Sequence, residues 1–327
     1  MMKHRTVRQR DSKKNILLLA LTALIWGVAF VAQSVGMEYV GPFTFNSVRF
    51  LIGGMVLLPI VMLSRKNSRD MTDDTEESTL DLEEELYKRR QENVQKNAQV
   101  KRRDLLIGGL CCGLALCVAS CLQQIGIGYT TVGKAGFITA MYIVIVPMMG
   151  IFLKKKTTWL VWISVALAAI GLYFLCMTES FQMGHGDLYV LACAAVFSVH
   201  ILLIDHFSPK VDGVALSCLQ FLVSGVIAGV AALIWEQPDL ASILAAWAPI
   251  LYAGVLSCGV AYTLQVVGQK GVDPTVASLV LSLESVFSVL AGWIILGQNL
   301  SAREWMGCGL MAVAIVLAQL PAPASQK

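Results

Sequence analysis

Three ionisable residues, Arg49, His200 and Glu284, lie deep inside long apolar stretches of this sequence. A charged side chain at the centre of a membrane-inserted helix costs about 2.5–3.5 kcal/mol, so such residues usually face a cavity or a partner. Glu284 could exchange a proton, His200 could relay one, and Arg49 could bind an anionic group or pair with Glu284. Each residue could instead have a structural role. Glu284 or His200 could be a buried hydrogen-bonding group. Arg49 could anchor its helix by binding backbone carbonyls, or its side chain could extend outward to the membrane interface.

The composition indicates that most of the chain faces lipid or lies among lipid-facing helices. Of 327 residues, 56% are hydrophobic and 14% are charged, against roughly 25% charged residues in an average soluble domain. Of the charged residues, 21 lie between Arg65 and Asp104 and seven in the first 14 residues, which leaves 19 for the other 273. Because so few charges cannot cover a water-exposed surface, a soluble enzyme, a secreted disulfide scaffold and an ordinary nucleic-acid binder are excluded. We expect no cofactor.

Ten apolar segments are long enough to cross the roughly 30 Å hydrocarbon core, which takes about 20 helical residues. The sequence therefore predicts an all-α integral membrane protein with ten transmembrane helices. The expected spans are Asn15–Val35, Pro42–Leu63, Leu105–Gln124, Gly133–Leu153, Thr158–Met177, Asp187–Ile204, Val214–Trp235, Trp247–Val267, Thr275–Gly297 and Arg303–Leu320.

The distribution of Lys and Arg predicts the orientation, because basic loops stay on the cytoplasmic side. With the N-terminus inside, 22 basic residues are cytoplasmic, Lys134 and Arg303 fall outside, and Arg49 falls within a span. Ten crossings then place both tails, residues 1–14 and 321–327, in the cytoplasm. We expect a multi-pass protein of the plasma membrane.

All nine cysteines lie within or at the ends of apolar segments, and none has C-x-x-C spacing. This pattern is typical of small packing residues and not of disulfides or a metal site. A soft-metal site is the alternative for the cluster in the third span, which holds Cys111, Cys112, Cys117 and Cys121.

The chain carries signs of an internal repeat. A shift of the sequence by 142 residues along its own length aligns five pairs of identical residues. They are Leu122/Leu264, Gln123/Gln265, Gly126/Gly268, Ala135/Ala277 and Gly150/Gly292. With another offset, Arg49-Phe50-Leu51 and Gly54 meet Gln220-Phe221-Leu222 and Gly225. We therefore expect two five-helix repeats, residues 15–177 with a charged insertion at 64–104, and residues 186–320. Because five is odd, the second repeat is inverted relative to the first, as in many secondary transporters.

Several local strings along the chain form a recognisable set. They are Trp26-Gly27-Val28-Ala29-Phe30, Phe45-Asn46-Ser47-Val48-Arg49-Phe50, Gly133-Lys134-Ala135-Gly136-Phe137-Ile138-Thr139, Val146-Pro147, Gly186-Asp187-Leu188, Leu281-Ser282-Leu283-Glu284-Ser285-Val286-Phe287 and Gly292-Trp293-Ile294-Ile295-Leu296-Gly297. With these strings the sequence resembles EamA-type transporters of the drug/metabolite transporter superfamily. Two departures from the family pattern are Ser285, where the family often has Pro, and a long loop after the second span.

The resemblance implies a secondary-active transporter with a central cavity between its halves, moving small metabolites by alternating access. Many relatives export amino acids or related compounds, so we expect export of such solutes. We place Glu284 in this cavity, in substrate or proton coupling, opposite Tyr142, its equivalent in the repeat. Further substrate or coupling candidates, some of which could instead pack helices, are Arg49, Trp26, Asn46, Gln123, His200, Gln220, Tyr262 and Gln265.

The charged insertion has Glu and Lys or Arg at helical i,i+4 spacing, as in Glu84/Lys88 and Glu85/Arg89. We expect a helix from about Thr79 without an essential transport role, and contact between Lys88–Arg103 and anionic lipid. A solvated loop is the alternative. A homodimer is left open.

Two rival classes remain: an intramembrane enzyme and a receptor or structural membrane protein. Gly184-His185-Gly186-Asp187 matches the G-x-G-D string of intramembrane aspartyl proteases. However, Asp187 falls at the entrance of a span, where it suits a helix N-terminus, and no second Asp lies deep within another span. The repeat and Glu284 favour transport, so we expect no enzymatic activity.

Overall fold

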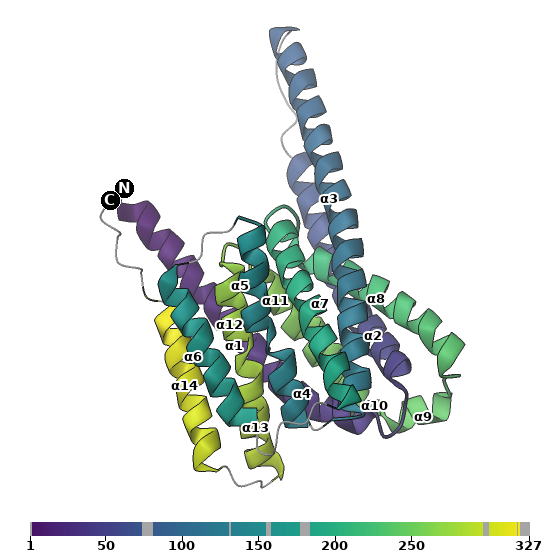
Figure 1. Cartoon of the computed structure of the whole chain (residues 1–327). Helices are drawn as coiled ribbons and strands as arrows, with labels where there is room; N and C mark the ends of the chain where they lie inside the picture. Colours follow the sequence, from purple (N-terminus) through teal and green to yellow (C-terminus); the bar gives the residue numbers. More distant parts are fainter. Residues whose placement is uncertain are drawn as a thin grey trace.

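A computed structural model shows a bundle of helices (Figure 1). In the part of the chain that it describes, all regular structure is helical and no residue lies in a β-strand. The described residues are 2–73, 81–130, 132–154, 158–176, 184–296, 301–318 and 320.

The first half of the chain forms six helices. They are α1 (Met2–Gly36), α2 (Pro42–Asp73), α3 (Asp81–Ile127), α4 (Val132–Thr139), α5 (Tyr142–Phe152) and α6 (Trp159–Cys176). The proline at the start of α2 suits the first turn of a helix, where its missing N–H leaves no bond unmade.

The second half contains eight α-helices and a π-helix, η1. They are α7 (His185–Phe207), α8 (Gly213–Trp235), α9 (Leu240–Ala245), α10 (Trp247–Leu251), η1 (Tyr252–Tyr262), α11 (Thr263–Gly268), α12 (Pro274–Leu281), α13 (Leu283–Leu296) and α14 (Ala302–Ala318). Aspartates cap several N-termini: Asp212 Oδ1 accepts from Ala215 N–H at 2.8 Å, and Asp273 Oδ1 accepts from Thr275 N–H at 2.9 Å.

Eight helical segments among the described residues are long and apolar enough to cross a membrane. They are Lys13–Gly36, Pro42–Leu63, Gln99–Ile127, Ala135–Phe152, His185–Phe207, Gly213–Trp235, Trp247–Gly268 and Pro274–Ala291. The fifth expected span corresponds to α6, whose described apolar part, Trp159–Phe174, is shorter than these eight segments. The tenth corresponds to α14, which has only 17 residues. The ten-span topology therefore stays a prediction.

Helices α6 and α14 lie side by side at the edge of the bundle (Figure 1). Gly171 makes this pairing close, because a Cβ atom there would lie 3.0 Å from the carbonyl oxygen of Gly307. Small residues at such contacts let membrane helices approach each other backbone to backbone. The packing shows that both helices are integral parts of the bundle.

The charged insertion continues directly into the third span. The helix that we expected from about Thr79 begins at Asp81 and runs without a break to Ile127. The part before Leu105 is about half of the 47 residues of α3. At about 1.5 Å per residue, this part extends roughly 36 Å. It projects beyond the bundle (Figure 1), as expected for a segment too polar to lie in lipid.

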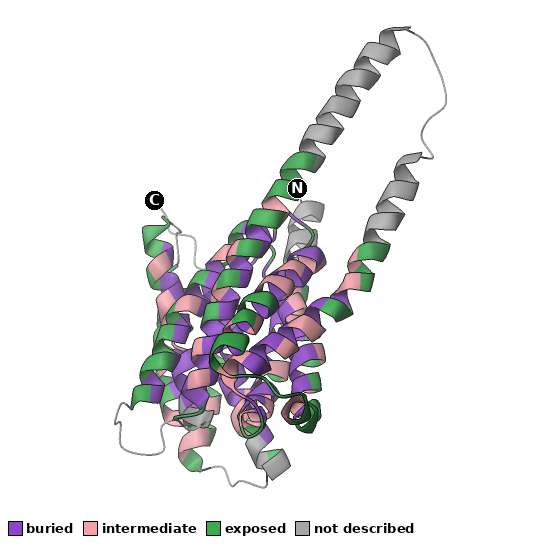
Figure 2. Cartoon of the chain, turned by 90° about the vertical axis from the view of Figure 1, so that its right-hand side faces the viewer, coloured by how far each residue is buried: buried purple, intermediate pink, exposed green. Residues whose placement is uncertain are grey.

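Buried residues fill the inside of the bundle and exposed residues lie on its periphery (Figure 2). The periphery is strongly apolar: Leu17, Phe152 and Leu233 expose 69%, 86% and 72% of their surface. Buried positions include many polar side chains, among them Gln123, Gln265 and several serines. An apolar outside is what the lipid environment of a membrane bundle requires.

The regular α-helix of the expected fourth and ninth spans is interrupted over one or two residues, here called breaks, at which the backbone keeps right-handed helical angles. Helix α4 ends at Thr139 and α5 begins at Tyr142, while α12 and α13 are separated only by Ser282. Ala140, within the first break, meets Ser282 at the shift of 142, so the two breaks coincide under the repeat seen in the sequence. Broken helices inside membranes are tolerated where they line a cavity.

Ser285, the departure from the family pattern, lies in the first turn of α13. Its hydroxyl donates to the carbonyl oxygen of Gly136 in α4 at 3.2 Å. The serine therefore links the two broken spans through a hydrogen bond that a proline could not make.

Candidate solute cavity

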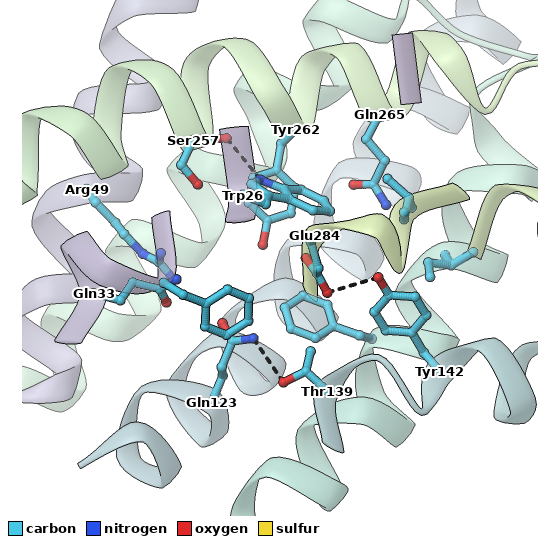
Figure 3. A pocket seen from close by; sticks show the side chains of 14 residues that line it. Trp26, Gln33, Arg49, Gln123, Thr139, Tyr142, Ser257, Tyr262, Gln265 and Glu284 are labelled. Atoms are coloured by element: carbon cyan, nitrogen blue, oxygen red, sulfur yellow. Dashed lines mark hydrogen bonds between the residues drawn. The ribbon is translucent and has the colours of Figure 1, made fainter. Parts of the chain in front are cut away.

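The broken spans border a cavity near the centre of the bundle. It contains about 470 Å³ of space, a volume that includes open solvent at its mouth. Its walls come from both halves of the chain (Figure 3). The lining residues are Trp26, Phe30, Gln33, Arg49, Gln123, Thr139, Tyr142, Phe197, Ile201, Ser257, Tyr262, Gln265, Leu281 and Glu284.

Glu284 and Tyr142 meet at the cavity, directly after the helix breaks. Glu284 lies in the first turn of α13, and Tyr142 is the first residue of α5. The Tyr142 hydroxyl donates to Glu284 Oε1 at 2.9 Å (Figure 3). The N-terminus of a helix favours a carboxylate through its unpaired N–H groups and dipole. The arrangement fixes one oxygen of Glu284 and can present the other to a proton or a cation.

Arg49 lines another part of the cavity and is 2% exposed. Its Nε donates to Asn46 Oδ1 at 2.8 Å, and its guanidinium carbon lies 4.9 Å from the centre of the Phe50 ring. Because the Arg49 side chain is buried, it does not extend outward to the membrane interface. The aromatic contact and the hydrogen bond hold a rigid cation at the cavity wall.

The ion pair considered for Arg49 and Glu284 does not form. Among the described residues, neither side chain has an oppositely charged group within 4.0 Å, although both line the same cavity. The two charges lie on different walls in Figure 3. The cavity therefore offers a cationic and an anionic group at separate places.

Aromatic and amide side chains line the space around these charges. Trp26 and Tyr262 form a pair with ring centres 4.5 Å apart. Gln123 Nε2 donates to Thr139 Oγ1 at 3.3 Å, whereas Gln265 Oε1 is buried and has no hydrogen-bond partner among the residues that the structure describes. Such a mixture of apolar walls and a few polar groups is typical of sites that bind small molecules.

Three of the candidate residues lie behind the cavity wall, not in its lining. Asn46 donates to the carbonyl oxygen of Ser120 at 3.1 Å and accepts from Arg49, so it orients the arginine. His200 Nε2 lies 3.0 Å from Gln220 Oε1, and both residues are fully buried. This pair is consistent with the alternative of a hydrogen-bonded core histidine.

Sequence reasoning did not single out seven of the lining residues, Phe30, Gln33, Thr139, Phe197, Ile201, Ser257 and Leu281. The repeat shifts contain a signal for five of them, all except Gln33 and Ser257. The lining holds five pairs of equivalent positions: Gln123/Gln265, Thr139/Leu281 and Tyr142/Glu284 at a shift of 142, and Trp26/Phe197 and Phe30/Ile201 at a shift of 171.

The aspartate of the G-x-G-D string and the cysteine cluster of the third span lie outside the cavity lining. Asp187 Oδ2 accepts from Gly184 N–H, and Oδ1 accepts from the Thr130 hydroxyl, both at 2.7 Å, so Asp187 caps α7. Cys112, Cys117 and Cys121 are buried. Among the described residues, no group of three or more His, Cys, Asp or Glu side chains is arranged to hold a metal ion.

Comparisons with known proteins identify a family and several related transporters. The EamA-like transporter family matches this chain at residues 13–80, 86–177 and 184–320. An uncharacterized transporter of Archaeoglobus fulgidus is 27% identical over 312 residues, which cover 92% of this chain and 84% of the relative. The uncharacterized transporter YwfM of Bacillus subtilis is 27% identical over 324 residues and 95% of each chain.

The uncharacterized inner membrane transporter YedA of Escherichia coli is a more distant relative. It is 22% identical over 313 residues, which cover 91% of this chain and 88% of the relative. A solved crystal structure with 15% sequence identity has the same fold, with a TM-score of 0.70 over 94% of this chain and 96% of the other. Because the family match extends over most of its length, the chain belongs to the EamA-like transporter family of the drug/metabolite transporter superfamily and is a membrane transporter.

Proposed function

We propose that this transporter exports small metabolites, such as amino acids or related compounds, by secondary-active alternating access through the central cavity. The observation that carries this proposal is the cavity lining, in which ten of fourteen residues form five pairs of repeat-equivalent positions. Inverted-repeat transporters place the solute at the interface between their two halves, so a lining made of equivalent positions supports this function.

The proposal includes ten spans arranged as two inverted five-helix repeats, residues 15–177 and 186–320. Reciprocal helix contacts support this arrangement. A Cβ atom at Gly54 would lie 2.8 Å from Leu222, and one at Gly225 would lie 2.9 Å from Leu51. At a shift of 171, Gly54 is equivalent to Gly225 and Leu51 is equivalent to Leu222. Such reciprocity is the mark of a twofold relation between two surfaces.

A second reciprocal contact lies between other spans. A Cβ atom at Gly126 in α3 would collide with Val190 in α7. A Cβ atom at Gly268 in α11 would lie 3.2 Å from Leu19 in α1. Gly268 and Gly126 are equivalent at the shift of 142, and Val190 and Leu19 at the shift of 171. Two independent contacts therefore support the same internal symmetry.

In this proposal Glu284 takes part in substrate or proton coupling and Tyr142 positions its carboxylate. Arg49, Trp26, Gln123, Tyr262 and Gln265 contact the solute, whereas Asn46, His200 and Gln220 act through the residues they support. Their places in and behind the lining support these roles.

We further propose that the protein lies in the plasma membrane with both termini in the cytoplasm. The excess of basic residues on one side supports this orientation. Lys101, Arg102 and Arg103 are exposed where α3 enters the apolar bundle, a position suited to anionic lipid headgroups.

A metabolite comparison tests the export function. Cells with and without the protein are grown in the same medium, and small metabolites are measured inside and outside. The proposal expects at least one solute to be enriched in the medium of expressing cells, and counterflow of that solute in proteoliposomes that hold the purified protein. Solutes that accumulate only inside the expressing cells would show import and contradict the direction.

A further inference from the structure

Two buried glutamines connect neighbouring spans at the edge of the cavity. Gln124 Nε2 in α3 donates to the carbonyl oxygen of Gln33 in α1 at 3.0 Å. Gln269 Nε2, directly after α11, donates to the carbonyl oxygen of Ile201 in α7 at 3.2 Å. Both acceptor residues belong to the cavity lining. Each bond therefore holds a wall of the cavity against a neighbouring helix.

The two contacts correspond to each other in the internal repeat. Helices α7 and α11 are the counterparts of α1 and α3 at the shifts of 171 and 142. In Figure 1, α4, which follows α3, lies at the end of the bundle away from the chain termini, whereas α11 lies nearer to them. In the proposed orientation the first contact faces outward and the second faces the cytoplasm. We call Gln124 and Gln33 the outer latch, and Gln269 and Ile201 the inner latch.

Each latch joins two helices that are packed against other partners. Helix α3 packs along its length against α7. A Cβ atom at Gly126 would lie 3.0 Å from the carbonyl oxygen of Gly186, and one at Gly108 would lie 2.9 Å from the Phe207 ring. Because these contacts lie near the two ends of the apolar part of α3, α3 and α7 form one continuous pair.

Helix α1 packs in the same way against η1 and α11. Thr22 Oγ1 donates to the carbonyl oxygen of Ala261 at 3.1 Å, and a Cβ atom at Gly268 would lie 3.1 Å from the carbonyl oxygen of Asn15. By contrast, α1 meets α3, and α7 meets α11, over only a short stretch. The latches are therefore thin contacts between two well-packed groups of helices, which can part while each group stays intact.

Both latches carry an unpaired acceptor. Gln124 Oε1 and Gln269 Oε1 are buried and have no hydrogen-bond partner among the described residues. A hydrogen bond contributes little net free energy in a folded protein, and an unpaired buried acceptor costs a comparable amount. When the helices part, water reaches both ends of the amide and removes this cost. A closed latch is therefore close in free energy to an open one.

We propose that Gln124 and Gln269 are positioning residues of two gates on opposite sides of the cavity. Release of the outer latch lets α1 and α3 part and opens the cavity outward, and release of the inner latch lets α7 and α11 part and opens it inward. One motion serves both gates: the α3/α7 pair rocks against α1, η1 and α11. The inference rests on the proposed transport function, because it names residues that control access to the same cavity.

The test measures access to the cavity from each side of the membrane. Ser257, a residue of the cavity lining, is changed to cysteine as a reporter. Membrane vesicles of both orientations receive the membrane-impermeant reagent sulfonatoethyl methanethiosulfonate, and the rate of labelling is measured. The protein without Ser257→Cys is labelled in parallel, and its rate is subtracted because it reports the native cysteines.

Shortening each latch side chain should open one gate. Gln124→Asn and Gln269→Asn keep the amide but place it one methylene short of the carbonyl oxygen, so a closed gate would bury an amide without its bond. Gln124→Asn should speed labelling from outside about 2- to 10-fold, the effect of one hydrogen bond, and Gln269→Asn should do the same from the cytoplasmic side. If an Asn variant does not fold, Gln124→Glu or Gln269→Glu replaces it. Closing the gate would then bury a charge, so labelling from the same side should rise at least about tenfold.

Two matched controls remove hydrogen bonds inside the packed groups at the same ends of the bundle. Asn15 Nδ2 donates to the carbonyl oxygen of Lys270 at 2.8 Å, and the Thr130 hydroxyl donates to Asp187 Oδ1 at 2.7 Å. Asn15→Ala and Thr130→Val should change neither labelling rate, because these bonds do not cross between the groups.

The side from which labelling changes decides the proposal. Unchanged rates in both latch variants, or faster labelling from the same side in both, would overturn it. Opposite sides with outside and inside exchanged would uphold the gates and reverse the proposed orientation. If a solute shows counterflow while the latch variants label like the wild type, transport stands and the gates are wrong. If the latch variants give the expected pattern and no solute shows counterflow, the proposed transport function fails and the gates remain.

Discussion

The N-terminus of α2 should be stabilised by a carboxylate from the other half of the chain. Glu236, at the end of α8, accepts from the backbone N–H groups of Phe43 and Thr44 at 2.8 and 2.7 Å. At the equivalent place in the second half, Asp212 caps its own helix, α8. Position 41, which corresponds to Asp212 at the shift of 171, is a glycine. Glu236 therefore provides the cap that Gly41 cannot.

The size of the effect follows from these contacts. Glu236 makes two charge-assisted bonds but is only half-buried, and loss of a side-chain cap costs about 0.5–2 kcal/mol. We expect Glu236→Ala to lower the free energy of unfolding by about 1–2 kcal/mol. A Cβ atom at Gly41 would collide with Cδ of Glu236. Gly41→Ala should therefore displace the carboxylate and cost about the same amount.

A double-mutant cycle separates the cap from other effects of these changes. The free energy of unfolding is measured by titration with dodecyl sulfate in mixed micelles. Once Glu236 is alanine, Gly41→Ala should cost little more, because the colliding carboxylate is gone. Gly309→Ala is a matched control, since no atom of the described residues lies within 4 Å of its Cβ position. An additional loss of about 1–2 kcal/mol from Gly41→Ala in the Glu236→Ala protein would refute the reasoning.

Three further predictions concern topology, the insertion and the cavity. Reporter fusions after Met37, Ser180 and Asp239 should report an outside location, and a cytoplasmic signal at any of them would overturn the topology. Replacement of residues 66–102 by a short Gly/Ser linker should leave insertion and counterflow near normal; loss of counterflow in a correctly inserted deletion protein would give the insertion an essential role. Tyr142→Phe removes the 2.9 Å hydrogen bond to Glu284 and should lower counterflow about tenfold, whereas an unchanged rate would show that Tyr142 does not position the carboxylate.

The helical character and most of the spans could be predicted because lipid imposes long apolar segments. Eight expected spans correspond to helices of sufficient length. Helices α6 and α14 are harder to assign, since α14 begins with Arg303 and Glu304 in its first turn and both helices are short. Packing between them, through Gly171 and Gly307, depends on residues far apart in the chain and leaves no local signal.

The sequence indicated which residues could carry charge into the bundle, but not which way each side chain points. Arg49 and Asn46 lie close together on one helix, yet only Arg49 reaches the cavity and Asn46 supports it from behind. His200 and Gln220 pair with each other away from the lining because α7 and α8 are rotated so that these side chains face the core. Rotation of a helix is set by packing, which hydropathy does not contain.

The breaks in the two central spans could not be predicted from hydropathy, since apolar residues continue through them. Ser282 and Ala140 interrupt helices without a proline at the break. The repeat shift nevertheless paired Tyr142 with Glu284, and the structure joins these residues by a hydrogen bond of 2.9 Å. Internal repetition therefore carried information about three-dimensional proximity that local patterns lacked.

The most direct test of the central claim is counterflow by Glu284→Gln in proteoliposomes, with the solute found in the metabolite comparison. The change keeps the size of the side chain and a hydrogen-bonding group near Tyr142 but removes the carboxylate. With the variant inserted at wild-type levels, counterflow should fall strongly, or lose its pH dependence if the carboxylate carries a proton, while Glu304→Gln transports normally. A wild-type rate and a wild-type pH profile in Glu284→Gln would contradict the account and leave Glu284 a structural residue.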